Sequence, residues 1–136
     1  MTLKNILMIG PKEAFAEIAE HPGLMCKLFV IDDGFKALLG FVKLRNKATK
    51  LAGVYIHQAT GRVELPMYFE MLRSIEAGMS IERTPIWVAV RNPSNFEGMS
   101  DREALTFVDL PDGDTPSQVV ESLVGQLNAF ADNSAV

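Results

Sequence analysis

Apolar residues gather in five short runs along the chain, and polar or helix-breaking residues separate the runs. Each run has the length of one strand, and the third is apolar from Leu51 to Ile56 before it ends on His57. Continuous apolar runs of this length are typical of strands covered on both faces, as in a parallel sheet. The predicted strands span residues 5–10, 27–31, 51–57, 85–90 and 105–110.

Four segments between and after these runs place apolar residues at helical spacing on one side. Gly78 is suited to the end of the third helix. Thr115, Pro116 and Gln118 are suited to the start of the last helix, as N-cap, first-turn and capping-box residues. The predicted helices span residues 13–20, 35–45, 64–77 and 116–131, whereas 92–100 is predicted as loop and any helix at 101–104 as short.

Strands and helices therefore alternate along nearly the whole chain, as in α/β proteins with right-handed crossovers. We predict a flavodoxin-like, doubly wound, five-stranded parallel sheet with strand order 2-1-3-4-5 and a shortened or missing helix between strands four and five. One domain is expected over residues 1–131, followed by a frayed tail at 132–136. Ligands of such sheets bind past the carboxyl ends of neighbouring strands, here beyond Gly10 and at His57.

The composition narrows the class of protein. Of 136 residues, 48% are hydrophobic, and the net charge of −4 comes without the basic stripe typical of nucleic-acid binders. No apolar run has the roughly 20 residues of a membrane span, and no secretory signal is visible. The single cysteine, Cys26, is expected to be a buried thiol in a reducing compartment. We expect a cytoplasmic protein that binds neither nucleic acid nor membranes.

Three local phrases, taken with this order of elements, carry a family resemblance. They are Asp-Asp-Gly-Phe-Lys-Ala-Leu at 32–38, Thr-Pro-Ile-Trp-Val at 84–88, and Pro111 after the fifth strand. The first resembles the segment between strand two and helix two in the receiver domains of bacterial two-component response regulators. The second resembles the fourth strand of receivers, and Pro111 resembles the proline that follows their lysine. The resemblance covers nearly the whole chain and implies the receiver fold.

The same resemblance shows where the phosphorylation residues of receivers would lie. Receivers carry an acidic pair that holds Mg²⁺ after strand one, a phosphate-accepting aspartate after strand three, a serine or threonine ending strand four, and a lysine before the proline. The matching positions here are Gly10, Pro11, Lys12 and Glu13, then His57 or Gln58, then Val90, and finally Leu110. Mg²⁺ needs several oxygen ligands, and phosphoryl transfer needs its developing charge neutralised. We therefore expect a pseudo-receiver without a metal, a cofactor or a catalytic residue.

Several of these side chains have both a chemical and a structural interpretation. His57 is a candidate for phosphoryl transfer, metal binding or pH sensing, or it is only a polar residue at a strand end. Lys12, His57, Gln58 and Arg91 are candidate anion or ligand contacts, and a solvated charged rim is the alternative. The aspartates at 32 and 33 follow an edge strand and are expected to be turn and cap residues.

The segment between strands four and five bears on partners. In receivers, helix four, strand five and helix five form the usual contact face, and a loop at 92–103 would uncover part of the sheet there. The candidate partner-face residues are Phe96, Met99, Phe107 and Asp109; alternatively, Phe96 and Met99 fold back and cover the sheet. Trp87 is predicted to be a core residue.

Two functions from different classes follow. The first is a non-phosphorylatable pseudo-receiver, not an enzyme, that binds a signalling partner or forms a homodimer through the partner face in bacterial two-component-type signalling. The second is a flavodoxin-like small-molecule binder or enzyme that uses the crevice at the ends of strands one and three.

Overall fold

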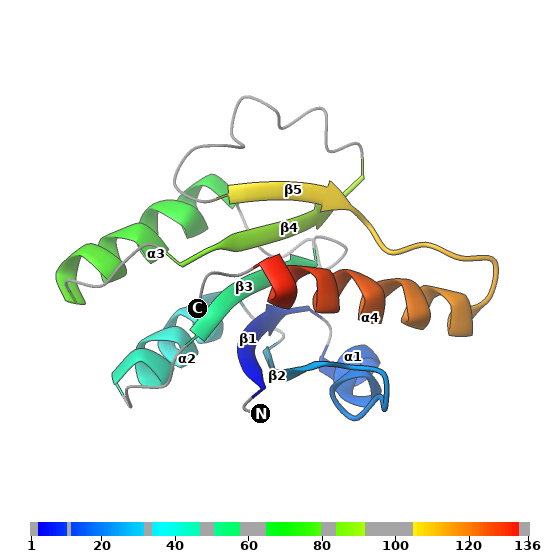
Figure 1. Cartoon of the computed structure of the whole chain (residues 1–136). Helices are drawn as coiled ribbons and strands as arrows, with labels where there is room; N and C mark the ends of the chain where they lie inside the picture. Colours follow the sequence, from blue (N-terminus) through cyan, green and yellow to red (C-terminus); the bar gives the residue numbers. More distant parts are fainter. Residues whose placement is uncertain are drawn as a thin grey trace.

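Five strands and four helices form the part of the chain that the structure, a computed structural model, describes (Figure 1). The described residues are 3–10, 12–31, 34–46, 51–57, 65–79, 84–91 and 105–133. In chain order the elements are β1 (Lys4–Ile9), α1 (Lys12–Ala19), β2 (Cys26–Ile31), α2 (Gly34–Asn46), β3 (Leu51–His57), α3 (Leu65–Met79), β4 (Ile86–Val90), β5 (Leu105–Asp109) and α4 (Pro116–Asn133).

The five strands form one parallel sheet in the order β2-β1-β3-β4-β5, which confirms the predicted topology. The apolar run at Leu51–His57 is the central strand, and its first six residues are all buried. Burial of such a run on both faces explains its unbroken apolar character, because neither side of the strand meets water. The carboxyl ends of β1 and β3 lie next to each other, with Ile9 opposite Ile56.

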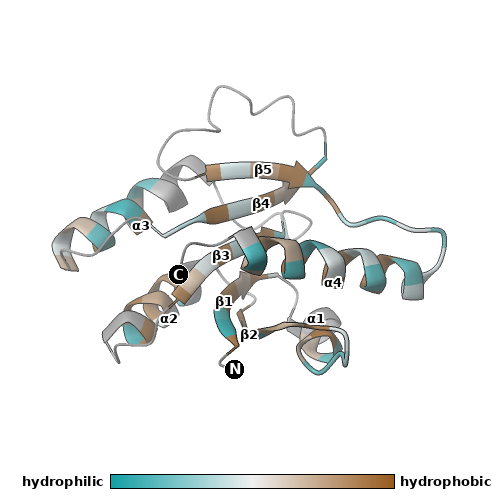
Figure 2. Ribbon diagram, viewed as in Figure 1, coloured by the Kyte–Doolittle hydropathy of each residue, from teal (hydrophilic) through white to brown (hydrophobic). Residues whose placement is uncertain are grey.

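Helices cover the sheet on both faces, and each face has its own apolar core (Figure 1). Leu38 and Phe41 of α2 and Leu72 of α3 pack on one face. Ile18 of α1 and an apolar stripe of α4 pack on the other. Figure 2 shows the hydrophobic colouring of β4 and β5 and the alternating hydrophilic and hydrophobic positions along α4. The inward residues of α4 are Leu123, Val124, Leu127, Phe130 and Ala131.

Gly53 of β3 lets α4 approach the sheet closely. The ring of Phe130 lies where a Cβ at Gly53 would be, because that atom would sit 2.2 Å from Phe130 Cζ. The same ring stacks on Trp87 of β4 with ring centroids 4.8 Å apart. The sequence predicts Trp87 to be a core residue. It is half-buried and packs, next to Phe130, against the core beneath α1 and α4.

The start of α4 matches its predicted cap. Gln118 donates its backbone N–H to Thr115 Oγ1 at 3.2 Å, as expected for an N-cap threonine. The Gln118 side chain accepts a hydrogen bond from the backbone of Asp114 at 2.6 Å, one residue earlier than the ideal capping box. The helix continues through Asn133, so the predicted end at 131 is two residues too early. Residues 134–136 of the predicted tail lie outside the described residues.

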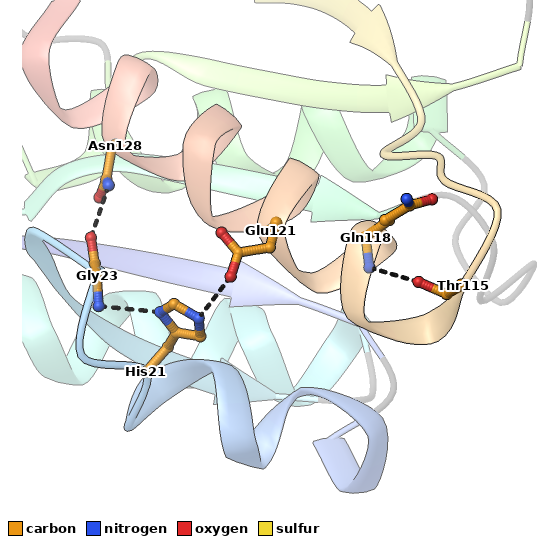
Figure 3. A network of polar contacts seen from close by, with 6 residues as sticks. All are labelled: His21, Gly23, Thr115, Gln118, Glu121 and Asn128. Carbon is orange, nitrogen blue, oxygen red and sulfur yellow. Dashed lines mark hydrogen bonds and ion pairs between the residues drawn. The ribbon is translucent and has the colours of Figure 1, made fainter.

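A polar network holds the turn between α1 and β2 against α4 (Figure 3). Asn128 of α4 donates to Gly23 O at 2.9 Å and accepts from the backbone N–H of Met25 at 2.7 Å. His21 Nδ1 accepts from the backbone N–H of Gly23 at 2.9 Å, and its Nε2 lies 3.6 Å from Glu121. Because Nδ1 is the acceptor, the geometry assigns the ring hydrogen of neutral His21 to Nε2.

A buried ion pair fixes the end of α3 to the residue that leads into β4. Glu76 is only 2% exposed, and its two carboxylate oxygens accept from Arg73 Nη1 and from the backbone N–H of Thr84, each at 2.5 Å. Arg73 also donates to Thr84 O at 3.1 Å. The helix ends at Met79, so Gly78 lies inside its last turn rather than beyond it.

The predicted weak helix between strands four and five cannot be compared with the structure. Residues 92–104, which include that segment, lie outside the described residues. Among the residues that are described, no helix is long and apolar enough to cross a membrane.

Candidate functional site

The candidate site is the C-terminal edge of the sheet, defined here by Gly10, His57, Val90, Asp109 and Leu110. Strand pairing places His57 beside Ala89, and Val90 beside Asp109. Backbone hydrogen bonds extend the pairing past the strand ends, since Gly10 N–H donates to Ile31 O at 3.0 Å and Leu110 N–H to Val90 O at 3.2 Å. The topology therefore brings together the strand ends that the sequence singled out.

His57 is the last residue of β3 and is half-buried. Side chains alternate along a strand, and Tyr55 belongs to the core beneath α1 and α4, so His57 is on that face as well. Burial lowers the pKa of His57 below its ordinary value of 6.5, and a backbone hydrogen bond opposes this only in part. The imidazole is therefore neutral at neutral pH.

Two neighbouring positions at this edge carry apolar side chains. Val90, at the end of β4, is 1% exposed and belongs to the core beneath α2 and α3. Leu110, just before Pro111, is half-buried against the other core. Neither side chain has a hydroxyl or an ammonium group that could bind a phosphoryl oxygen.

Two candidate residues at the edge, His57 and Asp109, do not converge. Phe107 packs against the α2 and α3 core and Val108 against the α1 and α4 core, so alternation puts Asp109 on the α2 and α3 face. Asp109 is exposed, and it is on the opposite face of the sheet from His57. Arg91, one residue past β4, is exposed too. Asp109 and His57 therefore do not face one ligand from the same side of the sheet.

Other candidates can be placed only in part. Gly10 is buried, and Lys12 and Glu13 are the first two residues of α1, but their side chains are outside the described part of the structure. Pro11, Gln58, Phe96 and Met99 lie outside the described residues. Within the described ranges, no group of three or more His, Cys, Asp or Glu side chains could hold a metal ion.

Sequence reasoning missed a polar link that joins β3, α4 and β5 near this edge. The Tyr55 hydroxyl donates to Gln126 Oε1, and Gln126 Nε2 donates to Asp109 O at 2.8 Å. Burial raises the pKa of Tyr55, so the hydroxyl stays protonated and remains a donor. The only signal in the sequence is a glutamine beside the apolar stripe of α4, between Leu123 and Leu127.

Three known structures with similar architecture are response regulators. The response regulator RPA3017 in red light signaling of R. palustris has 15% sequence identity and a TM-score of 0.62, over 98% of this chain and 97% of that chain. The phosphorylated cyanobacterial phytochrome response regulator RcpA has 14% identity and a TM-score of 0.59, over 99% of this chain and 98% of that chain. The Legionella pneumophila response regulator LqsR has 12% identity and a TM-score of 0.52, over 96% of this chain and 47% of that chain.

The sequence matches no protein-family model, and it has no significant similarity to a curated protein. At identities of 12 to 15%, the structural similarity establishes the fold. The chain has the fold of response-regulator receiver domains, as its order of elements and its local phrases predicted.

Proposed function

We propose that this protein is a pseudo-receiver, a receiver-fold module of two-component-type signalling that is not switched by phosphorylation and is not an enzyme. The observation that carries the proposal is the set of residues at the C-terminal edge of the sheet. Where the receiver pattern needs a carboxylate, a hydroxyl and an ammonium group, this chain has His57, Val90 and Leu110. The receiver-like structures support the signalling context.

The chemistry of phosphoryl transfer supports this proposal. An aspartyl phosphate needs a carboxylate nucleophile, which a neutral imidazole at His57 does not supply. Mg²⁺ takes hard oxygen ligands in near-octahedral geometry. Asp109, the one carboxylate among the five residues that define this edge, is exposed on the face opposite His57. With Leu110 in place of the lysine, charge developing on the phosphoryl oxygens also lacks that cation.

An unphosphorylated receiver fold acts through its surfaces, so we propose a cytoplasmic protein-interaction role. The candidate partner face includes β5, where Asp109 is exposed and Phe107 is half-buried against the α2 and α3 core. The partner is a signalling protein that recognises the unmodified chain. A homodimer through the same face is the second form of this proposal.

Phosphorylation with a small donor tests the proposal. The full chain is incubated with Mg²⁺ and acetyl phosphate, beside a receiver of known activity, and its intact mass is measured. We expect the mass to stay unchanged while the control gains one phosphoryl group. A label that is lost in alkali would be an acyl phosphate and would contradict the proposal. A label that resists alkali and disappears in His57→Ala would be a phosphohistidine, and it would contradict the proposal as well.

A further inference from the structure

Charges of opposite sign are separated along the chain. Residues 34–63, which include α2, contain six basic residues and no acidic one, whereas residues 103–136, which include α4, contain six acidic residues and no lysine or arginine. The two helices pack against opposite faces of the sheet. The basic set is Lys36, Lys43, Arg45, Lys47, Lys50 and Arg62, and the acidic set is Glu103, Asp109, Asp112, Asp114, Glu121 and Asp132.

The outer side of α2 combines this positive charge with an apolar side chain. Lys36, Leu39 and Lys43 are all exposed, and their spacing of three and four residues puts them on one side of the helix. Leu38 and Phe41 face inward to the core. Leu39 is 65% exposed, the highest value among the exposed large apolar residues of the described chain. A leucine held in water between two lysines is a suitable contact point for a partner with acidic groups on either side.

The outer side of α4 has the complementary pattern. Glu121 and Asp132 are exposed acidic residues, and the exposed positions between them include Gly125 and Ala129, which have no bulky side chain. The neighbouring α1 segment adds an exposed glutamate at Glu17 on the same face of the sheet. This surface would therefore attract lysines electrostatically and would leave room for an apolar side chain between its two acids.

We propose that a second copy of this chain docks head to tail, with the outer side of α2 of one copy against the outer side of α4 of the next. At 1.5 Å rise per residue, Lys36 and Lys43 are about 10 Å apart along α2 and the two acids about 16 Å apart along α4. The flexible four-carbon stems of the two lysines spread across this difference of about 6 Å, so that they reach the acids while Leu39 lies between them. The same chain carries both complementary surfaces, so its own copies meet these requirements without another protein.

This arrangement has two consequences that can be measured. The two surfaces differ and lie on opposite faces, so the contact is heterologous and extends into short linear assemblies instead of closing as a dimer. Contacts between exposed charges are weak and are screened by salt, with a Debye length of about 10 Å at 0.1 M and about 3 Å at 1 M. Association is therefore weak, concentration-dependent and lost at high salt. It does not depend on whether the chain is phosphorylated.

Sedimentation velocity of the full chain tests this assembly from micromolar to millimolar concentration, at low and at high salt. At low salt the average sedimentation coefficient rises with concentration, and at high salt it does not. Lys43→Glu, Leu39→Ser and Asp132→Lys each weaken association, the charge reversals by about tenfold. Lys27→Glu, the same charge change at an exposed position of β2, is the matched control and has little effect. Circular dichroism verifies that each variant is folded.

A mixing experiment isolates the pairing of α2 with α4. Lys43→Glu places a glutamate where α2 meets the acids of α4, and Asp132→Lys places a lysine where α4 meets the lysines of α2, so each variant alone associates more weakly. In their equimolar mixture the unchanged α2 surface of Asp132→Lys meets the unchanged α4 surface of Lys43→Glu, and association is restored. Asp132 is chosen because Glu121 also contacts His21. A wild-type chain that stays monomeric at low salt overturns the proposal, as does association that survives both reversals. A mixture that fails to associate overturns it as well.

Discussion

The contact between Gly53 and Phe130 allows a quantitative prediction for the substitution Gly53→Ala. The added methyl carbon would lie 2.2 Å from Phe130 Cζ and 2.9 Å from Cε2, whereas carbon atoms in van der Waals contact are about 3.5 to 4.0 Å apart. Gly53 does not have a positive φ, so alanine is compatible with the backbone. The effect therefore comes from the ring, which is 2% exposed, belongs to the α1 and α4 core and stacks on Trp87.

The magnitude follows from three contributions. Overpacking a well-packed core costs about 1 to 3 kcal/mol, and disturbing the stack of Phe130 on Trp87 costs about 0.5 to 1.5 kcal/mol more. Alanine also lowers the conformational entropy of the unfolded chain, which raises the free energy of unfolding by about 0.4 to 1 kcal/mol. We expect Gly53→Ala to lower the free energy of unfolding by about 2 kcal/mol, near the middle of the range of about 0.5 to 4 kcal/mol that these contributions span. Gly125→Ala is the control, because a Cβ there meets open space, and it should raise stability by about 1 kcal/mol.

Urea unfolding measures these changes, with the fluorescence of Trp87, the only tryptophan, as one probe and circular dichroism as the other. The explanation also predicts that Phe130→Leu makes room for the alanine methyl group. The double variant should then lose less stability than the sum of the two single changes. Wild-type stability in Gly53→Ala, or costs that simply add in the double variant, would refute the explanation.

Three further predictions rest on single contacts. Glu76→Ala leaves the largely buried Arg73 without its carboxylate partner and removes the acceptor of Thr84 N–H. We expect the free energy of unfolding, measured in urea, to fall by about 3 kcal/mol, whereas Glu70→Ala on the exposed side of the same helix should change it little. Burial lowers the pKa of His57, so the unfolded chain binds a proton at this residue at a higher pH than the folded chain does. The free energy of unfolding should therefore fall as the pH falls through 6.5, and it should fall less in His57→Gln. An equal fall in both proteins would contradict this. Asn128→Ala removes hydrogen bonds to the backbone of Gly23 and Met25, so the amide hydrogen of Met25 should exchange with solvent faster while the amides of β3 stay equally protected. An unchanged exchange rate at Met25 would contradict the role of Asn128 in holding this turn.

The architecture was accessible from the sequence because its signals are local. The apolar run at 51–57, the breaker residues and the alternation of strands and helices each depend on a few neighbouring residues, and the order of the sheet then follows from general rules of connection. The start of α4 was predictable for the same reason, since Thr115 caps the helix from three residues away. Helix ends were less accurate, and α4 continues two residues beyond its predicted end.

Contacts between distant elements were not accessible in this way. Glu76 follows the apolar Ile75 and would be expected to face water, yet it is buried because Arg73 and Thr84 supply its hydrogen bonds. Gln126 links Tyr55 to Asp109 across 71 and 17 residues of sequence, which no periodicity encodes. Such partners are fixed only once α4 lies across the sheet.

The candidate site shows the same division. The sequence identified which residues end the strands, and the topology brings Gly10, His57, Val90 and Leu110 to one edge. It did not reveal that His57 and Asp109 are on opposite faces, because that depends on the register of two strands that are not neighbours. A prediction of one site formed by the side chains of both His57 and Asp109 would therefore fail, although the sequence places each residue at the correct strand end.

The most direct test of the central claim, a receiver fold without the phosphorylation switch, is a titration observed through the amide NMR spectrum. Mg²⁺ is added to the isotopically labelled full chain, followed by acetyl phosphate. We predict no saturable shift at the amides of Gly10, His57, Val90 or Asp109, because the proposed pseudo-receiver lacks both the metal ligands and the phosphate acceptor of receivers. Saturable shifts clustered at these amides would mean that this edge binds metal, phosphate or another small ligand, and they would contradict the claim.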